Sequence, residues 1–188
     1  MDINKFVKEY IEEFKMVLDK FPFKEFEKIV DILLTAYNEQ KRIFIMGNGG
    51  SASTASHFAC DIGKGCSYKL DKRFKIFCLN DSIPTLLAYA NDLSYSDIFV
   101  EQMKNFLEPG DVAIGISASG NSENVLKAIS YAKKMGGKTV GLSGFDGGKL
   151  KNIVDIPLVV YINDMQKVED IHLIIVHILM QFLNQKLN

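Results

Sequence analysis

The stretch FIMGNGGSASTASHFACDIGKG, Phe44 to Gly65, decides how this chain is read. It passes from an apolar strand into a turn rich in glycine and serine, and then into a helix that carries His57 and Asp61. Glycine lets the backbone approach a ligand closely, and the free N–H groups at a helix start suit an anion. The stretch therefore predicts an anion-binding loop, followed one to three turns later by a histidine and a carboxylate.

Length and composition set the limits for the rest of the chain. Its 188 residues predict one domain, 1–188, with a single core. The formal net charge of −1 argues against a nucleic-acid partner, which needs a basic face. No apolar run is long enough for a signal peptide or a membrane span, so we expect neither. The three cysteines lack C-x-x-C spacing, which is typical of reduced thiols in a cytoplasmic protein.

Hydrophobic periodicity predicts an α/β fold. Two amphipathic helices, 3–20 and 24–40, form an N-terminal pair within residues 1–40. Strands and helices then alternate. The predicted strands are 42–47, 74–80, 111–117, 138–144 and 156–162, and the predicted helices are 51–62, 83–91, 95–107, 122–136, 149–154 and 165–185. The strands are apolar with little alternation, which indicates a five-stranded parallel sheet flanked by helices on both faces.

The last predicted helix, 165–185, is apolar almost all the way round. Such a helix is buried on most of its sides. Because one sheet face covers only one side, we expect a subunit interface here. A central core helix in a monomer is the alternative.

A second loop, SASGNS (117–122), also lies between a predicted strand and a predicted helix. Two such loops at the carboxyl ends of parallel strands indicate a phosphorylated ligand, although plain turn and capping chemistry would give similar sequences. The dinucleotide pattern is incomplete: Ala52 replaces its third glycine, and Asp81 lies too far along to be its acidic residue. No Walker motif is present. A small sugar phosphate fits these loops best.

Histidines and carboxylates gather on two of the predicted helices. His57 and Asp61 are four residues apart on one face, and Glu169 and His177 lie within about 80° of each other on the last helix. His172 points elsewhere and is expected to be structural or interfacial. The four residues could form a site for zinc or another divalent ion, or an acid/base pair. A surface ion pair and an isolated core histidine remain the alternatives.

Four segments together resemble the sugar-isomerase (SIS) family, and within it the phosphoheptose isomerases. They are GNGGSASTASHFACD, LLAYANDLSYSDIFVEQM, GISASGNSENVLKAISYAKKMGGKTVGLSG and VEDIHLIIVHILMQ. The resemblance implies a flavodoxin-like sheet and a homotetramer with active sites between subunits. It also implies conversion of sedoheptulose 7-phosphate to D-glycero-D-manno-heptose 7-phosphate, the first step toward activated heptoses for lipopolysaccharide or capsule.

The resemblance also implies site residues, position by position. Asp61 would be the catalytic base and His177 the acid/base partner. Zinc would be held by His57, Asp61, Glu169 and His177. Besides Asp61 and Glu169, the substrate would contact Asn48, Gly49, Gly50, Ser51, Asn91, Asp92, Ser117, Ala118, Ser119 and Ser122.

The chain departs from the family pattern near the predicted chemistry. Asp61 and Glu169 stand where the family usually has glutamate and glutamine, Gln166 where it has aspartate, and Gly65 where it has a basic residue. These changes leave the phosphate loops intact. They keep two alternatives open: a non-catalytic SIS protein that binds a phosphosugar or serves as an adaptor, and an isomerase of a different phosphosugar.

Overall fold

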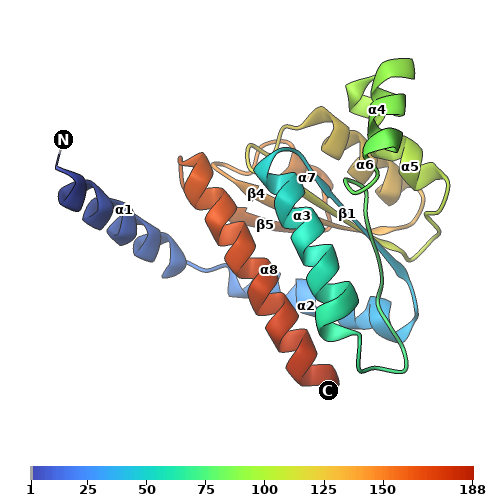
Figure 1. The fold of residues 1–188 in the computed structure, drawn as a ribbon, viewed down its shortest axis with the longest axis horizontal. Coiled ribbons are helices and arrows are strands. Elements are labelled where there is room, and N and C mark those ends of the chain that lie inside the picture. The colour runs from blue at the N-terminus through green and yellow to red at the C-terminus, as the bar shows by residue number, and fades with distance from the viewer. Residues whose placement is uncertain (1) are drawn as a thin grey trace.

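A parallel five-stranded sheet forms the centre of the structure, a computed structural model that describes residues 2–188 (Figure 1). Met1, where the predicted single domain begins, lies outside the described residues. The strands are β1 (Arg42–Gly47), β2 (Lys75–Cys78), β3 (Val112–Ser117), β4 (Lys138–Gly144) and β5 (Ile156–Val160). Their order, β2-β1-β3-β4-β5, is the flavodoxin-like order. The predicted fold class is confirmed.

Both faces of the sheet are covered, because successive side chains of a strand point to opposite sides. In β1, Ile43 and Ile45 join one core cluster and Phe44 and Met46 the other, and all four are fully buried. The first cluster is covered by α2 (Phe23–Asn38), α3 (Gly50–Cys60) and α8 (Met165–Leu187). The second is covered by α5 (Val100–Lys104), α6 (Glu123–Lys134) and α7 (Leu150–Ile153). Burial on both sides explains why the strands show so little alternation.

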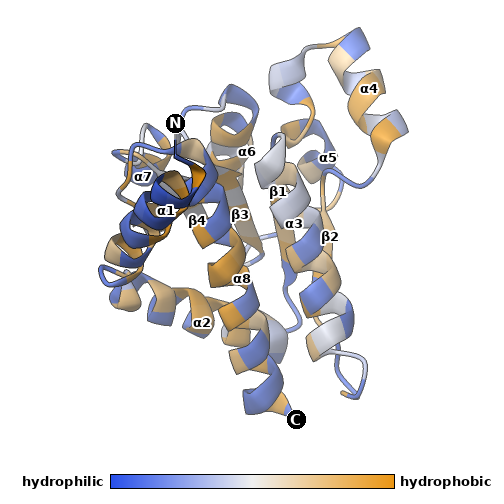
Figure 2. Cartoon of the chain, turned by 60° about the vertical axis from the view of Figure 1, so that its left-hand side comes forward, coloured by the Kyte–Doolittle hydropathy of each residue, from blue (hydrophilic) through white to orange (hydrophobic). Residues whose placement is uncertain are grey.

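Two helices lie at the periphery of this body and contact it through partly buried side chains only. α1 (Ile3–Leu18) and α4 (Ile83–Asp92) contain no buried residue. Figure 1 shows α1 extending from one end of the molecule, and Figure 2 shows apolar segments on the separate α4. Among residues 2–188, no helix is long and apolar enough to cross a membrane.

The second half of α1 is tied to α8 by polar contacts. The Lys167 ammonium group pairs with the carboxylates of Glu13 and Asp164 and lies 4.4 Å from the centre of the Tyr10 ring. The Tyr10 hydroxyl donates a hydrogen bond of 3.0 Å to Asp170. These contacts fix the direction of α1. Phe14, Val17 and Leu18 near its end pack against the first core cluster, whereas Ile3, Phe6, Val7 and Ile11 remain exposed.

Two predicted helices differ from the observed ones. The helix predicted over 95–107 is a 3₁₀ turn, η2 (Tyr95–Asp97), followed by the short α5. The Ser94 hydroxyl donates to the Asp97 carboxylate at 2.7 Å, and this local bond favours the turn over a continuous helix. The helix predicted over 51–62 continues beyond α3 as a π-helical segment, η1 (Asp61–Cys66). Such segments are frequent at functional sites.

Candidate active site

The candidate site begins where the strand order of the sheet reverses. β2 lies on one side of β1, whereas β3, β4 and β5 follow on the other, so the switch point lies between β1 and β3. The glycine loop (Gly47–Ser53) leaves β1 and the serine loop (Ser117–Ser122) leaves β3 at this point. With α8 they enclose an open cleft of about 310 Å³, lined by Asn48, Gly49, Gly50, Ser51, Ile116, Ser117, Ala118, Ser119, Ser122, Met165 and Glu169. The structure thus brings nine of the predicted substrate residues together.

The cleft offers hydrogen-bond donors suited to an anion. α3 starts at Gly50 and α6 starts just after Ser122, so two helix N-termini meet at the cleft. The first N–H groups of a helix have no partner within it, and the helix dipole places partial positive charge there. The hydroxyls of Ser117 and Ser122 lie 2.9 Å apart and add further donors. No lysine or arginine of residues 2–188 lines the cleft, so neutral groups would bind the anion.

Asn48 is held by a network that the sequence did not reveal. Its amide exchanges two hydrogen bonds of 2.9 Å with the amide of Asn124, and the Tyr95 hydroxyl donates to the same Asn48 oxygen at 2.8 Å. Asn124 is buried in α6. These contacts occupy the Asn48 oxygen and leave one N–H of its amide for a ligand. The signal in the sequence was Asn124 itself, a polar residue on the otherwise apolar face of the helix predicted over 122–136.

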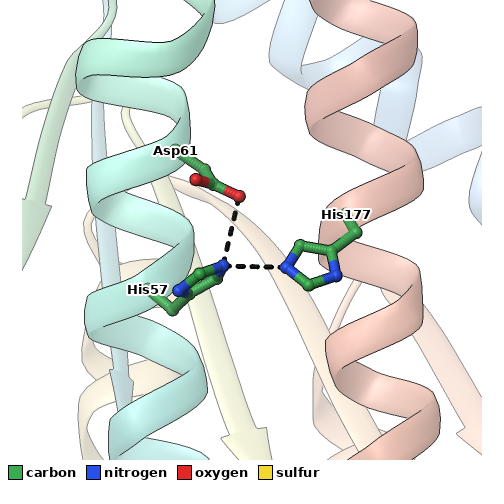
Figure 3. Close-up of side chains that lie close together, drawn as sticks. All are labelled: His57, Asp61 and His177. Atoms are coloured by element: carbon green, nitrogen blue, oxygen red, sulfur yellow. Dashed lines mark hydrogen bonds and ion pairs between the residues drawn. The ribbon is translucent and has the colours of Figure 1, made fainter.

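A second cluster lies between α3 and α8, which run side by side (Figure 1). His57 Nε2 is 2.8 Å from His177 Nε2 and 3.3 Å from Asp61 Oδ2 (Figure 3). Helical spacing places Asp61 one turn beyond His57, and the packing of α8 brings His177 from the other side. The three ligand atoms lie within 4.8 Å of one another. The structure thus brings together three of the four predicted ligand residues.

The cluster has the chemistry of a divalent-cation site. Asp61 Oδ2 is buried and has no hydrogen-bond partner among the described residues. When two imidazole nitrogens face each other, only one can carry the shared proton, so the other presents a lone pair. Two such nitrogens and a carboxylate oxygen are ligands that zinc accepts, with a fourth position left for another group. The same groups can also transfer protons.

Glu169 lies at the cleft, and the three-residue cluster does not include it. It precedes His177 by eight residues on α8, which is about 12 Å along the helix axis. Its carboxylate lies against the start of α3: a Cβ added at Gly50 would be 2.3 Å from Glu169 Oε2. The cleft and the cluster therefore occupy two levels of the same pair of helices.

Two further predicted residues lie apart from both levels. Asn91 and Asp92 are exposed at the end of α4, where the Asn91 amide donates to Asp92 at 2.8 Å. Neither residue lines the cleft.

His172 is a core residue, only 1% exposed. Its Nε2 lies 3.2 Å from the Ser143 carbonyl oxygen, and its Nδ1 has no partner among the described residues. Burial lowers its pKa to about 4, and the contact with the Ser143 carbonyl offsets only part of that effect.

This chain is similar to known proteins over most of its length, both in sequence and in fold. Residues 9–144 match the family model described as the SIS domain. A phosphoheptose isomerase from Helicobacter pylori is 43% identical over 152 residues, covering 80% of this chain and 78% of the relative. One from Nitratiruptor sp. is 36% identical over 185 residues, 97% of each chain. The solved structure of phosphoheptose isomerase from Neisseria gonorrhoeae superposes with a TM-score of 0.90 at 25% identity, covering 98% of this chain and 100% of that one.

Proposed function

We propose that this chain, which belongs to the SIS domain family and within it to the phosphoheptose isomerases, converts sedoheptulose 7-phosphate to D-glycero-D-manno-heptose 7-phosphate. One observation carries the proposal: an anion cleft and a cluster of two histidines and an aspartate share the same two helices. This arrangement suits a substrate with a phosphate at one end and a carbonyl at the other. The product would serve as a precursor of activated heptose for lipopolysaccharide or capsule.

The cleft would bind the phosphate and thereby position the sugar. The serine hydroxyls and the first N–H groups of α3 and α6 are the donors. A phosphate fixed at this level leaves the carbonyl end free to extend along α3 and α8 toward the cluster. Holding reactants in one geometry in this way supplies part of the rate enhancement without any chemistry at the phosphate.

The cluster would move the protons. Isomerisation removes a proton from C1 and protonates the C2 carbonyl oxygen, which gives an enediol. Loss of the O1 proton and protonation of C2 then complete the aldose. Asp61 is the proposed base at carbon, since its buried Oδ2 accepts no hydrogen bond from the described residues and has a 3.3 Å ion-pair contact with His57 Nε2. His177 would carry protons to and from the oxygens.

The same cluster would hold one divalent ion, proposed to be zinc. His57, Asp61 and His177 fit it, because a buried carboxylate oxygen that accepts no hydrogen bond from the described residues lies close to two imidazole nitrogens. An ion bound there would stabilise negative charge on the substrate oxygens. Glu169, the fourth ligand implied by the resemblance, contacts Gly50 here, so its ligand role stays a prediction.

The proposed assembly is a homotetramer. α1 exposes an apolar stripe of Ile3, Phe6, Val7 and Ile11, and α4 has no buried residue. A second copy covering these helices would bury them, and α4 could then carry Asn91 and Asp92 to the cleft of a neighbouring copy. A cytoplasmic location, expected from the cysteines, also stays a prediction.

Turnover of sedoheptulose 7-phosphate, followed by NMR as new aldose phosphate with and without zinc, tests the activity. We expect Asp61→Asn to abolish turnover while phosphosugar binding persists. Asp71→Asn is the matched control, because Asp71 is an exposed loop aspartate that does not belong to the cluster of His57, Asp61 and His177. Retained turnover in Asp61→Asn would exclude Asp61 as the base. Wild-type binding without turnover would favour a non-catalytic phosphosugar-binding protein or a different phosphosugar substrate.

A further inference from the structure

The serine loop is supported from behind by a second loop, which follows β4. We call residues 144–150 the buttress loop. Three hydrogen bonds join the two loops: Gly144 N–H to the Ala118 carbonyl at 2.8 Å, Leu150 N–H to the Gly120 carbonyl at 2.9 Å, and Lys149 N–H to the Asn121 side-chain oxygen at 3.2 Å. The two loops thus meet at several points rather than at one.

The backbones approach so closely that they exclude side chains. A Cβ on Gly120 would lie 2.1 Å from the Gly147 carbonyl oxygen, and one on Gly148 would lie 2.5 Å from the Ser119 carbonyl oxygen. Both glycines also have positive φ angles, +64° and +54°. Only glycine satisfies both conditions without strain. The contact between the loops is therefore a tightly packed backbone interface.

The contact determines which groups the serine loop offers to the cleft. A carbonyl oxygen facing an anion repels it, so an anion-binding loop must turn its carbonyls elsewhere. The Ala118 and Gly120 carbonyls accept bonds from the buttress loop, and the Ser119 carbonyl accepts one of 2.9 Å from the Asn121 amide. Ser117, Ser119 and Ser122 line the cleft, whereas Gly120 and Asn121 do not. The carbonyls are thus engaged by donors within the protein. The hydroxyls of Ser117 and Ser122 share one hydrogen bond and that of Ser119 accepts one from the Asn121 N–H, which leaves hydroxyl protons to donate to a ligand.

We propose that the buttress loop holds the serine loop in its anion-accepting conformation, with Gly148 and Asn121 as positioning residues for the phosphate. Neither touches the ligand. Each acts through the backbone of residues 118–120. The part of the inference that concerns catalysis rests on the proposed function. It predicts that loss of the buttress contact weakens phosphate binding and leaves proton transfer unchanged. The cluster of His57, Asp61 and His177 lies on other elements, so chemistry at saturating substrate should be preserved.

The test compares Gly148→Ala and Asn121→Ala with the matched control Gly136→Ala. Gly136 also has a positive φ, +80°, but its nearest neighbour would be 3.5 Å from an added Cβ, and it lies at the end of α6 remote from the serine loop. The control therefore reproduces the backbone strain without separating the two loops. Asn121 is exposed, so its truncation leaves the core intact if Gly148→Ala does not fold.

Two measurements are made on each folded protein: the dissociation constant for inorganic phosphate by ³¹P NMR titration, and KM and kcat for sedoheptulose 7-phosphate. We expect both test variants to raise the dissociation constant and KM about tenfold, the loss of one or two bonds to a charged group, with kcat within about twofold. Gly136→Ala should match the wild type. Unchanged phosphate binding in both test variants, or an equal loss in Gly136→Ala, would overturn the inference. If the wild type binds phosphate but turns over no sugar, the proposed function fails while the titration still decides the inference.

Discussion

Acidification should destabilise this fold through one buried side chain, His172. Burial lowers the pKa of its imidazole to about 4 from the ordinary 6.5, so the native state holds the ring neutral where the unfolded chain would protonate it. The unfolded state then binds more protons between these two values. Stability contributed by the neutral ring is complete above pH 6.5 and is lost as the pH falls toward 4.

The size of the effect follows from the shift. A difference of 2.5 pKa units, 6.5 minus 4, multiplied by about 1.4 kcal/mol per unit, sets a limit of about 3 to 4 kcal/mol on the loss, of which about 3 kcal/mol is reached by pH 4. His172 is 1% exposed, and burial lowers its pKa against the opposing effect of the Ser143 carbonyl, so solvent screening reduces the figure little. Loss of about 3 kcal/mol is a large fraction of the stability of an ordinary domain.

Urea unfolding at pH 7, 6, 5 and 4, at one fixed protein concentration, measures the effect in the wild type and in His172→Gln. The glutamine keeps an N–H that can donate to the Ser143 carbonyl but does not titrate. All other titrations are common to both proteins and cancel in the difference. We expect the wild type to lose about 3 kcal/mol more than the variant between pH 7 and pH 4. Parallel pH profiles would refute the assignment of the acid sensitivity to His172.

Two further outcomes are expected from the cluster and from α1. Metal analysis after dialysis against zinc should find about one equivalent per chain in the wild type and little in His57→Ala or His177→Ala; equal metal in all three would place the ion elsewhere. Phe6→Asp, on the exposed apolar stripe of α1, should reduce the mass measured by light scattering, whereas Lys8→Asp on the opposite side of the helix should not. Unchanged mass in Phe6→Asp would remove α1 from the proposed interface.

Much of the fold could be predicted because local patterns and global topology agree. β1, β3 and β4 are short, almost wholly buried runs that end at a glycine or a serine, and such runs are typical of a parallel sheet buried on both faces. The helix predicted over 95–107 was wrong in extent, since a hydrogen bond between Ser94 and Asp97 competes with helix continuation. The π-helical segment after α3 has no periodicity that distinguishes it from an ordinary helix.

The candidate site was predictable where helical spacing alone sets the geometry. His57 and Asp61 share a face of one helix, and the loops follow adjacent strands. The relative positions of α3 and α8 depend on packing, which spacing cannot supply. The predicted role of Glu169 as a ligand of the same ion as His57, Asp61 and His177 therefore stays a prediction. The contact of Glu169 with Gly50 is visible only in the structure.

The two levels along α3 and α8 have a consequence for substrate choice. Eight residues of α8, about 12 Å, separate Glu169 at the cleft from His177 at the cluster. If the phosphate binds in the cleft as proposed, the distance from the cleft to the cluster sets the length of carbon chain that can place its carbonyl at Asp61. A shorter sugar phosphate would occupy the cleft as firmly as a heptose, yet its carbonyl would stop short of Asp61. Such a molecule would compete with the substrate for the cleft without being turned over. The enzyme would then discriminate against shorter sugar phosphates by the position of their carbonyl and not by the affinity with which they bind.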